Sequence, residues 1–163
     1  MNRAIFFVFS ACAAVASPAA ARQRIDATTF TRLATGSDLF EIQSSQLALQ
    51  RSSNPRLRAF AQQMVNDHSM TSAALQQSAP TLTAFSNPFG MLDPRHAGML
   101  AQLPATTGTT FDRLYSQMQL AGHREAVGLF ATYASTGDDA RLVSFARTTL
   151  PRLRHHLAMA QRL

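Results

Sequence analysis

The chain has 163 residues, of which 46% are hydrophobic, and this is enough for one domain with a sizeable core. All fifteen basic residues are arginines, set against nine acids, and the formal net charge is +6. The arginines are scattered, without the basic stripe and interleaved aromatics of a nucleic-acid-binding face, so no nucleic-acid partner is expected. The charge is compatible with peripheral association with an anionic membrane or envelope polymer, although ordinary solvated surface explains it equally well.

Residues 1–21 are typical of a signal peptide, with a positive start at Arg3, an apolar run, and small residues leading to Ala21. We therefore expect cleavage after Ala21, export to the periplasm, and a single mature domain over residues 22–163. An alternative is lipidation of Cys12 in the weak lipobox FSAC, which would anchor the protein to a membrane. After cleavage the chain has no cysteine, which excludes disulfides, a thiolate nucleophile and iron–sulfur ligation.

Apolar residues recur at three- and four-residue steps in four long segments, and this predicts four amphipathic helices. The first is predicted from Asp26 to Arg51. Asn54 and Pro55 then form a cap and a first helical position for the second, which ends near Ala79. Because only a few residues separate these two helices, they should be antiparallel neighbours.

Prolines and glycines interrupt residues 80–110, which predicts a long crossover carrying a short helix over Pro94–Leu103. A third helix is predicted over Thr110–Ser135, and Asp138 is expected to cap a fourth that Pro151 kinks or restarts. No stretch has the period-2 pattern of a strand. The predicted fold is therefore all-α, a four-helix bundle of two antiparallel hairpins joined by the crossover.

Each long helix places one potential metal ligand on or beside its apolar stripe: Glu41, His68, His123 and His156. At a rise of about 1.5 Å per residue, Glu41 and His68 lie at similar heights from the turn that joins their helices. His156 is offset from His123 by on the order of 10 Å in the same count. The predicted metal site is therefore Glu41, His68 and His123, holding one transition-metal ion such as zinc, iron, copper or manganese, with His156 a secondary candidate.

Asp67 and Tyr115 are further secondary candidates. Asp67 lies about 100° round the helix from His68 and is expected to face an arginine at the bundle edge. The Tyr115 hydroxyl could instead join Glu41 and the histidines in a buried hydrogen-bond network that needs no metal. His96 and His155 are expected to be exposed. No catalytic residue and no organic-cofactor site is assigned, since nucleophile elbows, P-loops and dinucleotide fingerprints are absent.

Several short motifs lie along the predicted helices: Leu39–Gln43, Gln46–Ala48, Phe60–His68, Phe111, Asp112, Tyr115, His123, Leu150, Pro151, His156 and Leu157. Together these motifs resemble one family, the domain of unknown function 4142, often labelled "predicted outer membrane protein". The resemblance covers about residues 27–163 and implies a ferritin-like helical bundle in a bacterial envelope, with no established activity. A di-iron site of the ferritin-like type needs Glu-x-x-His motifs, whereas this chain has only two glutamates and no such motif.

These observations leave two main hypotheses for function. The first is a non-catalytic envelope protein with a structural, stress-related or interaction role and a buried Glu/His polar centre. The alternative is a carrier or redox protein that binds one metal ion through Glu41, His68 and His123. A third hypothesis is a partner helix or lipid bound by apolar residues of the crossover, including Phe85 and Phe89. Homo-oligomerisation is compatible with all three, and no protein partner is identified.

Overall fold

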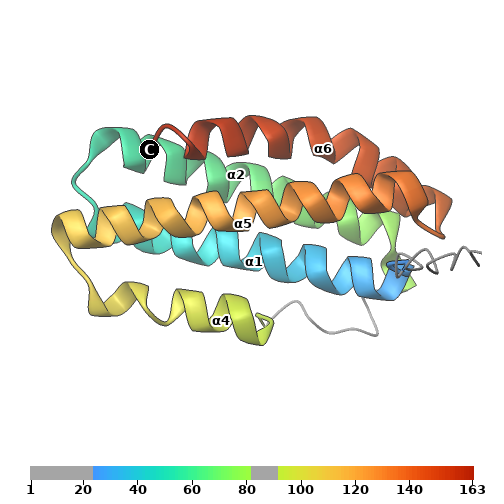
Figure 1. Ribbon diagram of the computed structural model, residues 1–163, viewed down its shortest axis with the longest axis horizontal. Coiled ribbons are helices and arrows are strands. Elements are labelled where there is room, and N and C mark those ends of the chain that lie inside the picture. The colour runs from blue at the N-terminus through green and yellow to red at the C-terminus, as the bar shows by residue number, and fades with distance from the viewer. Residues whose placement is uncertain (1–23, 82–91) are drawn as a thin grey trace, which may run out of the picture.

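The computed structural model describes residues 24–81 and 92–163, and every regular element in these ranges is a helix (Figure 1). The all-α prediction is therefore confirmed. The predicted signal peptide, Cys12, Phe85 and Phe89 lie outside the described residues. The helices are α1 (Ala27–Arg51), α2 (Pro55–Ser78), α4 (Pro94–Leu100), α5 (Gly108–Thr136) and α6 (Ala140–Ala160), with a short 3-10 turn η1 at Leu103–Ala105.

The four long helices lie side by side in two hairpins (Figure 1). Helices α1 and α2 pack against each other, as do α5 and α6. The hairpins meet along α1–α5 and α2–α6, so each long helix has two long neighbours. Helix α4 lies outside this group, against α1. No helix in the described part of the chain is long and apolar enough to cross a membrane.

Local sequence signals explain where most helices begin. The Asn54 carboxamide oxygen accepts from the backbone N–H of Arg56 and of Leu57, and Pro55 occupies the first helical position of α2. Asp93 and Pro94 start α4 in the same way.

Two predicted boundaries were wrong, and of the kink or restart predicted at Pro151 the restart does not occur. Asp139, not Asp138, caps α6, because Asp138 accepts a hydrogen bond from the Tyr133 hydroxyl at 2.9 Å. Helix α6 continues through Pro151 without restarting. The short helix α4 ends at Leu100 instead of Leu103, which begins the separate turn η1.

The core is divided along its length into three parts. An apolar cluster at one end joins the start of α1, the end of α2, the end of α5 and the start of α6, around Phe30, Phe130, Tyr133 and Phe145. A second apolar cluster at the other end gathers around Phe40, Phe60, Met64, Phe111 and Tyr115. The section between them is polar although it is equally buried, and it contains Asp38, Glu41, His68, Gln119, His123 and His156.

Candidate metal centre

Three histidines from three helices converge in the polar middle section. His68 on α2, His123 on α5 and His156 on α6 are each at most 1% exposed. Their ring centroids are 5.4 to 5.5 Å apart in all three pairs. One ring nitrogen from each lies within 4.8 Å of the ring nitrogens offered by the other two. The sequence therefore paired His68 with His123 correctly, whereas the predicted displacement of His156 was wrong.

The error in the height of His156 has two physical causes. The predicted count treated the turn residues as helical rise, but α5 ends at Thr136 and α6 starts at Ala140. His123 lies thirteen residues before the end of α5 and His156 sixteen after the start of α6, a difference of only about 4.5 Å. Side chains also tilt toward the N-terminus of their own helix, which in antiparallel helices carries these two rings toward the same level.

Each of the three rings is held by a hydrogen bond through one nitrogen. His68 Nδ1 lies 2.7 Å from Asp38 Oδ1, and His156 Nε2 lies 2.8 Å from Asp67 Oδ2. His123 Nδ1 lies 2.8 Å from the backbone carbonyl of Gln119. A carbonyl and an ionised carboxylate can only accept, so the ring nitrogen facing each of them carries the proton.

The second nitrogen of each ring is buried and has no hydrogen-bond partner among the described residues. These atoms are His68 Nε2, His123 Nε2 and His156 Nδ1. In a neutral imidazole whose first nitrogen carries the proton, the second is an unprotonated lone-pair donor. Buried polar atoms are almost always paired, so three such nitrogens close together could hold a cation in place of hydrogen-bond partners. Transition-metal cations accept nitrogen ligands of this kind.

Burial keeps two of the rings neutral. It lowers the pKa of His123 to about 3 and that of His156 to about 4, in both cases reinforced by the charge of His68. For His68, burial also opposes protonation, but the hydrogen bond and the charge of Asp38 outweigh it and raise the pKa. His68 is therefore the ring on which a proton competes most strongly with a cation.

Glu41 lies beside the centre but on its outer side. Its carboxylate is 1% exposed, and Oε1 lies 3.6 Å from His123 Nδ1, the nitrogen already bonded to Gln119. Burial raises the pKa of Glu41 to about 7, although the charge of His68 and the Gln119 side chain act in the opposite direction. The structure thus brings Glu41 next to His123 while placing it away from that ring's free nitrogen.

Of the secondary candidates Asp67 and Tyr115, only Asp67 is hydrogen-bonded to one of the three histidines within the described structure. Asp67 pairs with His156 and accepts from Gln63, and it also interacts with the charge of Arg152, in line with the expected arginine. The Tyr115 hydroxyl pairs with Ser45 at 2.8 Å, and among the described residues it makes no hydrogen bond to a histidine.

Of the two histidines expected to be exposed, only His155 is. His96 is buried, because α4 packs on α1 and stacks the His96 ring on Phe40 at a centroid distance of 5.0 Å.

Two residues of the centre escaped the sequence analysis, Asp38 and the backbone carbonyl of Gln119. Asp38 could have been found by counting, because it lies thirteen residues before the end of α1 and His68 lies thirteen after the start of α2. Equal distances from a tight turn place two residues of a hairpin at one height. The Gln119 carbonyl could not be found in this way, because every residue has a backbone carbonyl and the sequence does not show which one a histidine will contact.

Comparison with known proteins supports the fold and the family. No curated protein matches the chain. A solved structure described as "CopM in the Cu(II)-bound form" is similar with a TM-score of 0.68, at 15% sequence identity, over 85% of this chain and 95% of that one. At this identity the similarity concerns the fold. The model of the family "Domain of unknown function (DUF4142)" matches residues 10–163, nearly the whole chain, and the protein belongs to this family.

Proposed function

We propose that the protein binds one transition-metal ion through His68, His123 and His156. The observation that carries this proposal is the set of three buried ring nitrogens without partners, His68 Nε2, His123 Nε2 and His156 Nδ1, on rings that converge from three helices. Three imidazoles are a known ligand set for zinc and copper.

The hydrogen bonds around the rings support the same function. Metal-binding histidines almost always donate their other N–H to a carboxylate or carbonyl, which fixes the ring and makes its free nitrogen more basic. Asp38, Asp67 and the Gln119 carbonyl have these positions here. This pattern favours metal binding over the metal-free hydrogen-bond network, because such a network would use the ring nitrogens that remain unpaired.

In this proposal Glu41 supplies charge and is not a ligand. Its buried carboxylate lies close to His123 Nδ1 and offsets part of the positive charge that a divalent ion brings into a dry core. The Glu41 carboxylate lies near His123 Nδ1, which is already bonded to Gln119, and it does not join the three ring nitrogens that lie together. We therefore remove Glu41 from the predicted ligand set.

The burial of the centre suits holding an ion better than turning over a substrate. All three ligands are at most 1% exposed, whereas metal catalysis needs an open coordination position that a substrate reaches. We therefore propose a metal-holding role such as storage or transport. The ferritin-like assignment of the bundle, the mature domain over residues 22–163 and a periplasmic location are part of the same proposal.

Copper(II) is the first ion to test, because nitrogen and oxygen sites bind it more tightly than the other divalent first-row metals. The neighbouring CopM structure holds Cu(II), and its fold resembles this one. The mature chain, purified without a histidine tag, would be mixed with Cu(II) or Zn(II) and desalted, and its metal content measured by plasma mass spectrometry. We expect about one equivalent to be retained.

The matched variants are His156→Gln and His155→Gln, which change adjacent residues that differ in burial. His156→Gln should lose most of the bound metal, and His155→Gln should retain it. Equal retention by both variants, or no retention by the unmodified chain with either ion, would leave the metal-free network as the correct description.

A further inference from the structure

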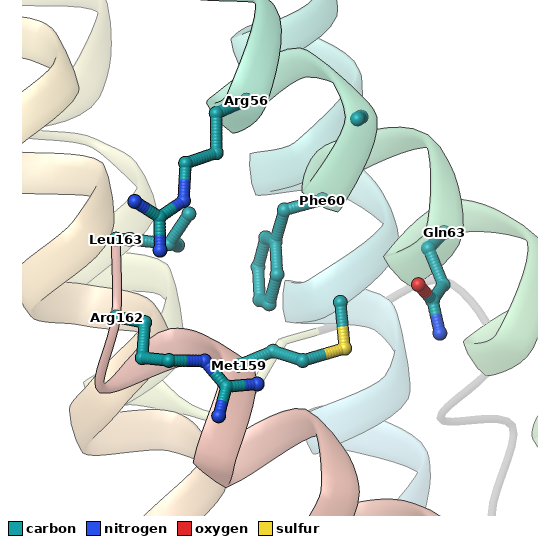
Figure 2. A pocket seen from close by; sticks show the side chains of 7 residues that line it. Arg56, Phe60, Gln63, Met159, Arg162 and Leu163 are labelled. Carbon is teal, nitrogen blue, oxygen red and sulfur yellow. The ribbon is translucent and has the colours of Figure 1, made fainter.

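A second feature of interest lies away from the histidines, where the beginning of α2 lies beside the end of α6. A cavity of about 260 Å³ opens between the beginning of α2 and the end of the chain after α6 (Figure 2). Its apolar lining comes from Ala59 and Phe60 on α2, Met159 on α6 and Leu163. The Phe60 ring is 3% exposed, so most of it is covered by protein.

Two arginines line the same cavity, and both are free to bind. Arg56 comes from the first turn of α2 and Arg162 from the segment after α6, and Figure 2 shows their guanidinium groups near the Phe60 ring. Neither guanidinium makes a hydrogen bond or ion pair with any described residue, and both side chains are exposed. By contrast, Arg51 and Arg147 donate to backbone carbonyls.

Among the described residues, no acidic side chain lines the cavity. The nearest acid along α2 is Asp67, which is already bonded to His156 and to Gln63. The terminal carboxylate at Leu163 makes no ion pair with either arginine. The cavity therefore combines two uncompensated positive charges with an apolar wall.

We propose that this cavity binds a small amphiphilic carboxylate. The carboxylate lies between Arg56 and Arg162, since the planar guanidinium fork matches a carboxylate with two parallel hydrogen bonds. The apolar part lies against Met159, Leu163 and the small part of Phe60 that the cavity exposes. The volume is slightly below the range of about 300 to 1,000 Å³ found for drug-sized ligands, so a short aliphatic or single-ring acid fits best.

This inference does not rest on the proposed metal site. It uses none of the three histidines, and it is tested on metal-free protein. The probes are octanoate and benzoate, titrated into the mature chain at low ionic strength and followed by calorimetry and by amide chemical shifts. We expect saturable binding, with the largest shifts at Arg56, Phe60 and Met159.

A double variant, Arg56→Gln with Arg162→Gln, tests the charged side of the cavity. The control is Arg113→Gln with Arg141→Gln, which removes the same charge from two exposed arginines elsewhere that also lack side-chain partners. The cavity variant lacks both guanidinium partners of the carboxylate, so it should bind octanoate about tenfold more weakly. The control variant should bind like the unmodified chain.

A third variant, Ala59→Phe, tests the apolar side by filling the cavity with a ring, and it should also abolish octanoate binding. The proposal is overturned if octanoate binding does not saturate, if both double variants weaken it equally, or if acetate binds as tightly as octanoate. It is also overturned if free octanoate fails to bind while anionic phospholipid vesicles bind through Arg56 and Arg162, because the arginines would then form a membrane contact.

Discussion

The ends and the middle of the core are equally buried but are built from different chemistry. At one end Phe30 stacks on Tyr133 with centroids 4.0 Å apart and meets Phe130 edge-on at 5.1 Å. In the middle the same helices bury carboxylates and imidazoles, several of whose atoms have no partner. Apolar burial stabilises the fold, whereas burying an unpaired polar atom costs free energy.

This contrast indicates that the ends and the middle of the helices have different roles. The two apolar ends stabilise the four-helix arrangement and hold it rigidly enough to bring three rings together. The middle lowers the stability of the metal-free chain, and a bound cation would recover it. Breaking the ends and breaking the middle should therefore have separable consequences.

The largest effect is expected at an apolar end. Phe30→Ala removes a fully buried ring and its contacts with Tyr133 and Phe130. It should lower the free energy of unfolding by about 3 to 5 kcal/mol, as for other buried aromatics. Chemical denaturation of the metal-free chain measures this, and metal content measured while the variant is folded should be unchanged. A loss below about 1 kcal/mol would mean that this end is not the main source of stability.

Two groups in the middle should make stability depend on pH in opposite directions. Burial raises the pKa of Glu41 from its usual 4.5 to about 7. Between these values the folded chain keeps a proton that the unfolded chain has lost, so this carboxyl destabilises the fold progressively as pH rises. Glu41→Gln mimics the protonated form. It should stabilise the chain by up to about 3 kcal/mol at pH 8 and by little near pH 4.5.

The control for Glu41 is Glu125→Gln, because Glu125 is an exposed glutamate paired with Arg95. A surface ion pair of this kind contributes about 0 to 1 kcal/mol, so its removal should have a small effect at both pH values. A benefit of Glu41→Gln that is the same at pH 4.5 and pH 8 would contradict burial as the cause of the raised pKa.

His156 should act in the other direction. Its pKa is lowered from 6.5 to about 4, so below pH 6.5 the unfolded chain takes up a proton that the folded chain does not. The metal-free fold should therefore lose about 2 kcal/mol through this group as pH falls from about 6.5 to 5. In His156→Gln the slope of stability against pH over this range should decrease, while His155→Gln keeps it. An unchanged slope in His156→Gln would show that this ring already titrates normally.

The smallest expected effect separates two glycines on α5. A Cβ at Gly122 would lie 2.9 Å from Glu41 Oε1 and 3.5 Å from the Phe40 ring, whereas a Cβ at Gly128 meets nothing within 4 Å. Gly128→Ala should stabilise the chain by up to about 1 kcal/mol through helix propensity. Gly122→Ala should lose that gain because the Glu41 carboxylate must move. Equal melting temperatures for the two variants would mean that the Glu41 carboxylate moves away from the new Cβ without a cost in stability.

The fold was largely predictable because its signals are local. Periodicity located the four long helices, and the pairs Asn54-Pro55 and Asp93-Pro94 marked two helix starts correctly. Asp138 and Asp139 could not be separated by sequence, since either can cap and the choice depends on the hydrogen bond from Tyr133 to Asp138.

The centre was only partly predictable because it depends on heights between helices. His68 and His123 follow from their apolar stripes, but His156 required the true length of the turn and the tilt of the side chains. Glu41 was predicted as a ligand from its position on α1, yet only the structure shows that it faces the outer nitrogen of His123. His96 was misjudged because the packing of α4 on α1 is not encoded in its own short helix.

The metal centre is tested most sharply by the imidazole nitrogen-15 spectrum of the protein during a Zn(II) titration, since Zn(II) is diamagnetic. The account predicts that at about one equivalent three rings change, His68 and His123 through Nε2 and His156 through Nδ1, while His96 and His155 do not. Spectra in which the buried rings stay unchanged, or in which His155 alone responds, would contradict a metal centre in the middle of the four helices.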